Sequence, residues 1–236
     1  MDTTLKKFRK EKMEKIFKIK NNEFDFYYIN KENLKILEKI SKKEFKIKKE
    51  FKNSERNYVA EIVIDNQSYI LKDNKNEYKK FFNIIKKIFL NSDGVQILKN
   101  SISAKEEGFN NFAKMIGVIE KRKFRILKKS LIILENIEGK ICEEDFLKDK
   151  ALEVIKKLHT IGRYHGDCNP YNFIEEKKSK EVKIIDSKMK KMIFGNYRAH
   201  YDMLTMQLDS YSNMKYPYSK DMYYYIALAV KKIKKL

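Results

Sequence analysis

The sequence predicts an α+β fold with two parts, a β-rich part followed by a mostly helical part. Hydrophobic residues make up 42% of the 236 residues, which is enough for a sizeable core. Between Phe45 and Lys72 hydrophobic residues alternate with polar ones as in strands, and Asp65–Gln67 supplies a turn. Residues 150–160 instead carry hydrophobic residues at helical spacing. These patterns predict an antiparallel sheet early in the chain and helices late in it.

The other elements follow in order. We expect the first forty residues to be helical, with one helix beginning after Asn30, and a helix over 99–115 to end near Gly117. The other expected helices are 75–90, 198–212 and 220–235, and the other strands are 124–127, 131–137, 172–175 and 182–185.

The boundary between the two parts is expected near Glu135–Gly139, where strands give way to helices. The first domain would be 1–137, with N-terminal helices before a β-rich core at about 45–137. The second would be 138–236, helical with a small hairpin.

Positive charge dominates the composition, because 53 Lys and Arg against 33 Asp and Glu leave a net charge of +20. Only six of these residues are Arg and 47 are Lys. Base recognition and bidentate phosphate binding favour Arg, whose planar guanidinium meets two acceptors at once. The composition therefore disfavours nucleic acid as a partner. Most lysines are expected on the solvated surface, where a diffuse positive potential suits an anionic substrate or the anionic inner membrane face.

Several common kinds of site are excluded. The seven glycines form no G-x-G and no G-x-x-x-x-G-K-[ST], which excludes the usual dinucleotide fingerprint and the P-loop. Two distant cysteines, Cys142 and Cys168, make neither a disulfide framework nor a four-ligand zinc site. No segment reaches the roughly 18–20 apolar residues of a membrane span, and the charged N-terminus lacks a signal-peptide core. We expect a cytoplasmic protein.

One segment, Leu158–Phe173 followed by Val182–Asp186, carries the residues that predict chemistry. A loop after a helix contains Asp167 and, at a spacing of five, Asn172, and a hairpin strand then ends in Asp186. Two carboxylates and an amide converging beside a hairpin are oxygen ligands that suit Mg²⁺. Phosphoryl transfer needs such a metal site, and a carboxylate to receive the proton of the acceptor hydroxyl.

The motif H-G-D-x-x-x-x-N followed by I-I-D resembles the protein-kinase-like phosphotransferases, in the variant used by small-molecule kinases. With the following Phe-Ile it is most similar to the bacterial lipopolysaccharide core heptose kinases. The resemblance is specific over 158–186, is weaker from about Tyr58 to Asp202, and does not reach the first forty residues. It implies a two-lobed fold, an antiparallel-sheet N-lobe with helices and a short, mostly helical C-lobe, using ATP and Mg²⁺.

The resemblance also implies roles for individual residues. Asp167 would be the catalytic base or the carboxylate that orients the acceptor hydroxyl, and Asn172 and Asp186 would hold Mg²⁺. Lys72, at the end of a strand, would bind the α- and β-phosphates of the nucleotide. Glu106 would pair with Lys72, and Glu107 and Glu77 are the alternatives for that pairing.

The segment 131–139 resembles the strand and hinge that hold adenine, so backbone groups of Glu135 and Ile137 would contact the base. The phosphate-covering loop at 52–57 departs from the family pattern, because it contains no glycine. Asn169 stands where protein kinases usually carry Lys.

Three residues near this motif are expected to have structural roles. His165 is expected to pack under the loop, and Cys168 to be a small loop residue rather than a nucleophile. Asp202 resembles the helix aspartate that braces the catalytic loop, with an exposed helix carboxylate as the alternative. The segment beginning at Asp186 lacks the Phe-Gly of protein kinases, so their switch is not expected here.

We predict an ATP- and Mg²⁺-dependent kinase that phosphorylates a sugar hydroxyl on a lipopolysaccharide core heptose or a similar envelope glycan. Only 50 residues follow Asp186 and no A-P-E occurs, which favours a glycan or small-molecule acceptor over a protein. One alternative is another small-molecule phosphotransferase, acting on an aminoglycoside, an amino alcohol or another sugar. The other is a non-catalytic basic module on a degenerate kinase fold that binds nucleic acid or membrane.

Overall fold

The computed structural model describes residues 14–233, which fall into two compact units. The first unit runs to Val95 and resumes over Ile116–Leu134, and the second comprises Gln96–Met115 and the chain from Glu135 onward. The division into domains 1–137 and 138–236 stays a prediction, because the units are defined by contacts and not by independent folding.

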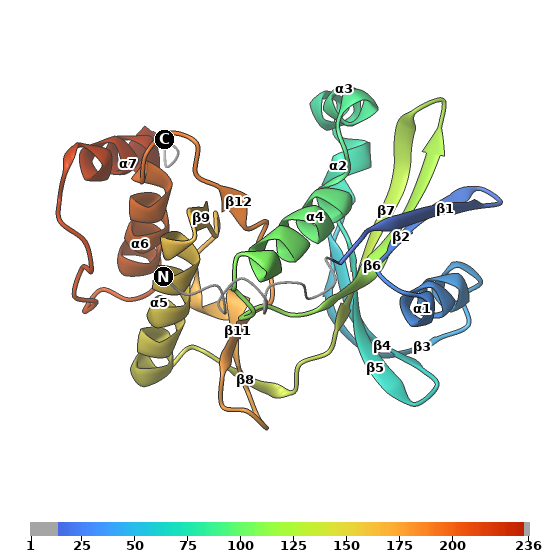
Figure 1. Ribbon diagram of the computed structural model, residues 1–236, viewed down its shortest axis with the longest axis horizontal. Coiled ribbons are helices and arrows are strands. Elements are labelled where there is room, and N and C mark those ends of the chain that lie inside the picture. The colour runs from blue at the N-terminus through green and yellow to red at the C-terminus, as the bar shows by residue number, and fades with distance from the viewer. Residues whose placement is uncertain (1–13, 234–236) are drawn as a thin grey trace, which may run out of the picture. The chain divides into compact units, whose positions relative to one another are not determined.

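A seven-stranded sheet forms the first unit, in the order β1-β2-β6-β7-β5-β4-β3 (Figure 1). Its pairs β1–β2, β2–β6, β3–β4 and β4–β5 are antiparallel, and the last two are those that the alternating sequence predicts. The strands are β1 (Phe17–Asn21), β2 (Phe24–Tyr28), β3 (Lys46–Asn53), β4 (Tyr58–Ile64), β5 (Gln67–Asp73), β6 (Met115–Lys123) and β7 (Ile126–Glu135). The helices of this unit are α1 (Lys31–Ser41), α2 (Asn76–Lys79) and α3 (Phe81–Phe89).

The turn between β4 and β5 is the predicted one. Asp65 and Asn66 have φ values of 48° and 64°, and this left-handed pair connects two twisted strands with the least distortion. Asp and Asn tolerate the left-handed region better than most residues do. The strand Gln67–Asp73 therefore returns in register beside Tyr58–Ile64.

Helix α1 begins where the sequence predicts. The side chain of Asn30 accepts a hydrogen bond from the N–H of Asn33 at 2.9 Å, which is the usual role of a residue preceding a helix. Leu37 and Ile40 are buried and pack into the core of this unit together with Phe26 of β2.

Two expectations about this region are wrong. The first forty residues are not all helical: residues 14–16 lie outside regular structure, Phe17–Asn21 and Phe24–Tyr28 are strands, and residues 1–13 lie outside the described part. Gly117 does not end a helix but lies inside β6. Glycine is required there because a Cβ would sit 2.5 Å from the carbonyl oxygen of Tyr27. The helix itself ends earlier, before Gly108 at φ +90°.

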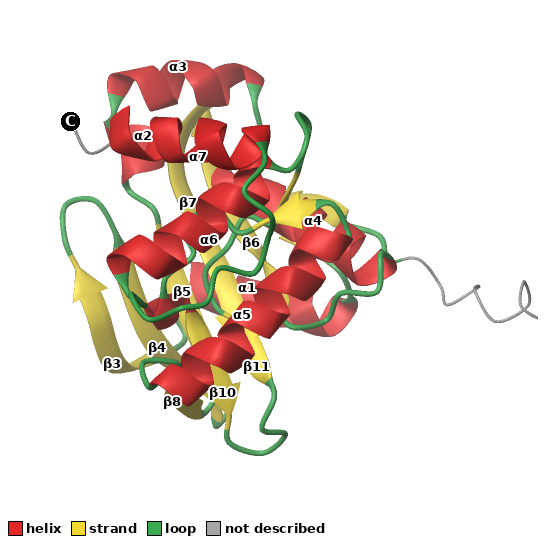
Figure 2. Cartoon of the chain, turned by 90° about the vertical axis from the view of Figure 1, so that its left-hand side faces the viewer, coloured by secondary structure: helices red, strands yellow, loops and turns green. Residues whose placement is uncertain are grey.

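The second unit is mainly helical, as predicted, and includes a three-stranded sheet in the order β11-β10-β8 and the pair β12–β9. Figure 2 shows α5 and α6 side by side, and His159 of α5 contacts Asp202 of α6. Its elements are α4 (Asp93–Glu106, whose first turn belongs to the first unit), β8 (Gly139–Ile141), α5 (Asp145–Thr160), β9 (Arg163–Tyr164), a 3₁₀ turn (Pro170–Asn172), β10 (Phe173–Glu176), β11 (Val182–Ile184), β12 (Lys190–Lys191), α6 (Tyr197–Asp209) and α7 (Met222–Ile233).

The core of this unit forms around α5, whose residues Leu152, Ile155 and Leu158 are buried as its helical spacing predicts. Phe173 of β10 joins the same core and fixes the start of the hairpin that follows the loop at 165–172. Among residues 14–233, no helix combines the length and the apolar character that crossing a membrane requires.

Candidate active site

The loop between β9 and β10 presents Asp167 at the surface of the second unit. Gly166 supplies a φ of +92° immediately before it, a backbone conformation that costs least for glycine. Pro170 begins a single 3₁₀ turn that is capped by the side chain of Asn169, which accepts from the N–H of Tyr171 at 3.1 Å. The loop sequence thus fixes its own backbone.

Two side-chain amides hold the carboxylate of Asp167. The Nδ2 of Asn169 donates to Oδ1 at 3.2 Å, and the Nδ2 of Asn172 lies 3.4 Å from Oδ2. The Nδ2 of Asn172 also donates to the carbonyl oxygen of Asp167 at 2.7 Å. Asn169, where protein kinases usually carry Lys, therefore orients the carboxylate with a neutral donor.

Asn172 also links the loop to the strand that precedes Asp186, because its carbonyl oxygen accepts from the N–H of Ile185 at 2.9 Å. The loop and the hairpin thus bring Asp167, Asn172 and Asp186 into one region of the second unit, as predicted. Asp167 and Asp186 are both exposed residues.

The donor set at this place fits a magnesium ion. The Nδ2 of Asn172 is bound to Asp167, which leaves its Oδ1 as the candidate ligand atom, and Asp186 supplies a carboxylate from the segment after β11. Mg²⁺ in phosphate-binding sites takes one or two such protein oxygens and completes its shell with water and phosphate. No cluster of three or more His, Cys, Asp or Glu suited to a metal occurs within 14–233.

Asp202 of α6 braces the loop from below. Its Oδ2 accepts from the N–H of His165 at 2.6 Å, and its Oδ1 accepts from the N–H of Gly166 at 2.9 Å. The Nε2 of His159 lies 3.2 Å from the same carboxylate, which is almost fully buried. Asp202 is therefore a buried brace and not an exposed helix carboxylate.

His165 packs under the loop, as expected. Its ring lies 5.2 Å from the ring of Phe173, and its Nδ1 accepts from the N–H of Asp167 at 3.2 Å. Burial lowers the pKa of His165, so the imidazole stays neutral and can accept this hydrogen bond. Ser187 adds a bond from its Oγ to the carbonyl oxygen of His165 at 3.1 Å, which ties the segment after Asp186 to the loop.

Cys168 is also a structural residue. It is fully buried, and burial raises the pKa of its thiol well above the usual value. A thiol that stays protonated is a poor nucleophile, which agrees with its expected role as a small loop residue.

Lys72 lies in the first unit, on β5. It points to the opposite side of the strand from Tyr69 and Leu71, which belong to the core of that unit. The side chain is therefore kept out of the core, as a nucleotide-binding lysine requires.

The glycine-free turn between β3 and β4 is closed by its own polar groups. The N–H of Ser54 donates to the carbonyl oxygen of Asn57 at 2.9 Å, and the Nζ of Lys75 donates to the carbonyl oxygen of Ser54 at 3.0 Å. The N–H of Asn76 donates to the carbonyl oxygen of Arg56 at 3.2 Å. Side-chain and backbone donors from the chain after β5 thus shape a turn that glycine usually shapes.

The three glutamates considered as partners of Lys72 have different surroundings. Glu106 is the exposed last residue of α4. Glu107 is bound by the buried guanidinium of Arg163 at 2.6 Å and by Lys191 at 3.1 Å, which lowers its pKa to about 2. Glu77 is buried in the first unit, where its carboxylate accepts from the N–H of Asp93 at 2.7 Å.

In the segment 131–139, which is expected to hold adenine, one backbone N–H already donates a hydrogen bond. The N–H of Glu135 donates to the carbonyl oxygen of Lys114 at 2.9 Å, and its side chain accepts from the N–H of Lys114 at 2.7 Å. The groups that remain candidates for adenine are the carbonyl oxygen of Glu135 and the N–H of Ile137.

Sequence reasoning missed the supports of this site. His159 contacts Asp202 and the hydroxyl of Tyr218, and Arg163 binds Glu107, Ser103 and the carbonyl oxygen of Met189. The Arg163–Glu107 pair spans 56 positions of sequence, so no local pattern marks it. The one available signal was the residue type, because Arg163 is one of only six Arg in a chain whose other basic residues are Lys.

Comparison with known proteins places the chain in context. The family model described as "Lipopolysaccharide core biosynthesis protein (WaaY)" matches residues 15–236. Among solved structures, one of WaaP in complex with acyl carrier protein has a TM-score of 0.48 at 14% identity, covering 83% of this chain and 90% of that chain. The Mycobacterium tuberculosis PknI kinase domain, as a double mutant, has a TM-score of 0.47 at 10% identity and covers 75% of each chain. No curated protein matches.

The family match covers nearly the whole chain and agrees with what the catalytic loop predicts. The order of the elements agrees with the prediction in part: β5 with Lys72 is followed by three helices, α2, α3 and α4, where two were expected, then by β6 and β7, and α5 precedes the loop and the hairpin of β10 and β11. The chain therefore belongs to the WaaY family of lipopolysaccharide core biosynthesis proteins, as a phosphotransferase with a kinase-like fold.

Proposed function

We propose that this protein transfers the γ-phosphate of ATP, with Mg²⁺, to a hydroxyl group of a lipopolysaccharide core heptose. The observation that carries the proposal is the presentation of Asp167. Its carboxylate is exposed, oriented by two amides, and placed on a loop that the buried Asp202 holds through two backbone N–H groups.

Asp167 would accept a hydrogen bond from the acceptor hydroxyl and take its proton as the oxygen attacks phosphorus. An oriented carboxylate favours the reactive geometry before the proton moves, and this positioning is a large part of catalysis in phosphoryl transfer. Asn172 and Asp186 would hold Mg²⁺, which neutralises phosphate charge when it is bound with the nucleotide. The neighbouring His165 is neutral, so it adds no competing positive charge to the carboxylate.

On the nucleotide side, Lys72 would bind the α- and β-phosphates. The carbonyl oxygen of Glu135 and the N–H of Ile137 would contact adenine. Glu106 is proposed as the carboxylate that orients Lys72, with Glu77 as the alternative. Glu107 is the least suitable of the three, because Arg163 and Lys191 already bind it.

The acceptor side of the proposal rests on the family, which is one of lipopolysaccharide core biosynthesis proteins. A core acceptor is a sugar carried on a lipid, so we also propose that the protein works in contact with the anionic inner membrane face. The net charge of +20 supports this contact through attraction to acidic lipids.

A panel of acceptors tests the proposal. Wild-type protein is incubated with Mg-ATP and core oligosaccharides that carry or lack an unmodified heptose, and with an aminoglycoside and an amino alcohol. We expect phosphate transfer only to the heptose-containing oligosaccharides. Transfer to the aminoglycoside or the amino alcohol instead would assign another small-molecule phosphotransferase. Failure of Mg-ATP to raise the melting temperature would contradict nucleotide binding, since a ligand bound only to the folded state must stabilise it.

The partner of Lys72 is tested by Glu106→Gln and Glu77→Gln, each assayed for the KM of ATP. The proposed pairing predicts that Glu106→Gln raises this KM about tenfold, roughly the effect of losing one charge-assisted contact. Because Glu106 is exposed, this variant should keep the melting temperature of the wild type. A raised KM in Glu77→Gln alone, at unchanged melting temperature, would move the role to Glu77.

A further inference from the structure

Helix α3 of the first unit exposes most of its apolar side chains, although an ordinary surface helix buries them. Its protein-facing side carries the polar Asn83 and Lys87 beside the half-buried Ile84 and Ile88. Phe81, Phe82 and Phe89 are 69%, 78% and 80% exposed, and Leu90, which follows the helix, is 62% exposed. No residue of this nine-residue helix is fully buried. We call Phe81, Phe82, Ile85, Phe89 and Leu90 the outer face of α3.

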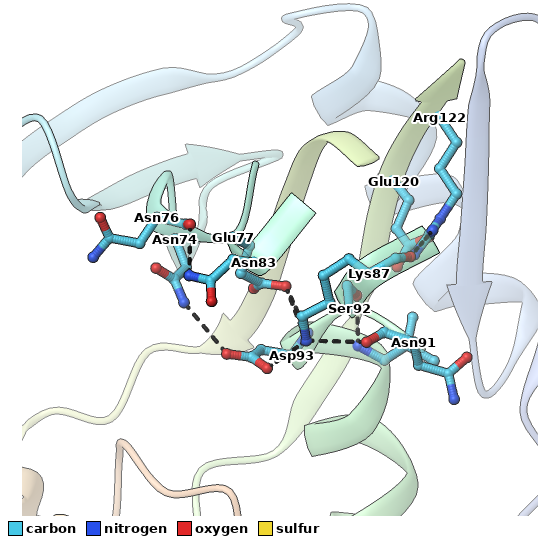
Figure 3. A network of polar contacts seen from close by, with 11 residues as sticks. Asn74, Asn76, Glu77, Asn83, Lys87, Asn91, Ser92, Asp93, Glu120 and Arg122 are labelled. Carbon is cyan, nitrogen blue, oxygen red and sulfur yellow. Dashed lines mark hydrogen bonds and ion pairs between the residues drawn. The ribbon is translucent and has the colours of Figure 1, made fainter. Parts of the chain in front are cut away.

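A polar network fixes this orientation (Figure 3). The Nζ of Lys87 lies 2.7 Å from the carboxylate of Asp93 and 3.6 Å from that of Glu77, and it donates to the carbonyl oxygen of Asn91 at 3.0 Å. Lys87 itself is only 13% exposed. These specific contacts therefore hold α3 in the orientation that leaves its outer face exposed.

A second attachment lies one turn away on the same side of the helix. The Nδ2 of Asn83 donates to the carbonyl oxygen of Asn76 at 2.9 Å. Asn83 and Lys87 are four residues apart, so they share one side of α3, whereas Phe81, Ile85 and Phe89 share another at the same spacing.

The hairpin of β6 and β7 ends next to α3 and carries a further exposed aromatic ring. The guanidinium of Arg122 donates to the carbonyl oxygen of Lys87 at 2.8 Å and to that of Arg125 at 3.0 Å, which joins the hairpin to the end of the helix. Phe124, at the tip, is 88% exposed and has a φ of +49°. A bulky aromatic residue in this region of backbone space is uncommon, because its Cβ crowds the chain.

The surroundings of the outer face are uniformly basic. No Asp or Glu occurs in 78–91 or in 121–130. The acids just outside these segments, Glu77, Asp93 and Glu120, have basic partners in Lys87 and Arg122. The exposed basic residues of these two segments are Lys79, Lys80, Lys86, Lys123, Arg125, Lys128 and Lys129.

We propose that the outer face of α3, with Phe124, inserts into the interface of a membrane that contains anionic phospholipids. Exposed aromatic and aliphatic side chains partition into the boundary between headgroups and acyl chains, and lysines around them attract acidic headgroups. A second copy of the chain is a poorer occupant, because pairing two such faces would bring two basic rims together.

This inference deepens the proposed membrane contact by naming its surface, and it rests on the proposed function only for its biological purpose. Vesicle binding needs no ATP and no acceptor, so failure of the inference and failure of the kinase proposal are distinguishable.

The absence of Trp from the chain offers a direct probe. Phe82→Trp and Phe51→Trp each give a protein with a single Trp. Phe51 is a matched control, since it is an exposed Phe of the same unit, 52% exposed, with the Nζ of Lys49 5.1 Å from its ring centre. Each variant is titrated with vesicles of phosphatidylethanolamine and phosphatidylglycerol, and with vesicles of phosphatidylcholine alone.

We expect the emission of Phe82→Trp to shift to shorter wavelength with the anionic vesicles and to be quenched by lipids brominated along the acyl chain. The emission of Phe51→Trp should not change. A double variant, Phe82→Ser with Phe89→Ser, should bind the anionic vesicles at least about tenfold more weakly than wild type. It should keep its melting temperature and its activity on a water-soluble acceptor.

Three results would overturn the inference. One is an equal response to both kinds of vesicle, which would remove the role of the basic rim. Another is unchanged vesicle binding by the double variant. The third is an absence of vesicle binding combined with a wild-type dimer that the double variant converts to monomer, which would assign the outer face to a second copy of the chain.

Discussion

Two buried polar networks in this molecule hold two opposite kinds of surface. In the second unit, the carboxylate of Asp202 binds the backbone of a loop and leaves Asp167 exposed to solvent. In the first unit, the ammonium group of Lys87 binds Asp93 and Glu77 and leaves the apolar outer face of α3 exposed. One network presents a carboxylate, and the other presents aromatic rings.

In both networks the buried anchoring residue decides which side chains a segment exposes to solvent. A loop of polar residues and a helix of apolar residues would ordinarily turn in opposite directions, one toward water and one toward a core. At α3 the buried ion pair prevents that outcome. The loop needs its anchor for geometry, and the helix needs its anchor to keep an apolar face outward.

The largest expected effect concerns the group that the first network presents. Asp167→Asn should lower kcat by about 10²–10⁴, because the amide cannot take the proton of the acceptor. The melting temperature should not change, since the side chain is exposed. The rate of phosphate transfer to a core acceptor measures the effect, and a variant with wild-type kcat would remove Asp167 from the reaction.

Asn169→Ala provides a graded companion to that variant. It removes one of the two amides that orient the carboxylate while leaving the carboxylate in place. We expect kcat to fall by about tenfold with the KM of ATP unchanged, because the variant loses the hydrogen bond to the Asp167 carboxylate and the cap on the N–H of Tyr171. A change in KM alone would mean that Asn169 acts on the nucleotide.

Breaking the first network at its anchor should cost stability as well as activity. Asp202→Ala leaves the buried N–H of His165 and the N–H of Gly166 without their acceptors, for about 2–3 kcal/mol of unfolding free energy. Denaturant unfolding measures this loss. Asp149→Ala, an exposed carboxylate on α5, serves as the control and should lose little. Equal stability of the two variants would contradict the bracing role.

Breaking the second network should weaken the attachment of α3 to the first unit and leave the loop at 165–172 unchanged. Lys87→Met leaves Asp93 and Glu77 without this cation, and we expect a loss of about 2 kcal/mol together with weaker vesicle binding. Lys86→Met is the matched control for stability, since Lys86 is the adjacent lysine of the same helix and is exposed. If the two variants unfold alike, Lys87 does not anchor the helix.

The smallest expected effect is a pH dependence from Glu107. Arg163 and Lys191 lower the pKa of Glu107 from 4.5 to about 2, so the stability it contributes is present above 4.5 and is lost as the pH falls toward 2. The contribution is at most about 2 kcal/mol, because the side chain is 29% exposed. Melting temperatures of the wild type and Glu107→Gln should converge as the pH falls through this range, and a constant difference would contradict the pairing.

Local signals explain what the sequence predicted well. The turn at Asp65–Gln67, the cap at Asn30 and the hairpin after Asn172 each depend on residues within a few positions of one another. The first two strands were missed although Phe24, Phe26 and Tyr28 alternate, because the helical pattern that follows Asn30 was extended to the whole region before it. Partners far apart in sequence gave no pattern at all.

Gly117 is a second case in which the local sequence does not reveal a neighbour that is distant along the chain. Its position after a helical stretch suggested a helix end, whereas its function is to let the backbone of β2 approach β6. Similarly, Asn83 and Lys87 lie on the side of α3 that the sequence marks as polar and therefore as solvent-facing. Only the partners Asp93 and Glu77 reverse that assignment.

The central claim is that Asp167 directs phosphate to a core heptose, and phosphorus NMR of the product tests it most directly. A heptose-containing core oligosaccharide is incubated with Mg-ATP and either the wild type or Asp167→Asn. We predict a new phosphomonoester signal on a heptose with the wild type and none with the variant over the same time. A signal of equal size from both proteins, or no new ester from a wild type that binds Mg-ATP, would contradict the account.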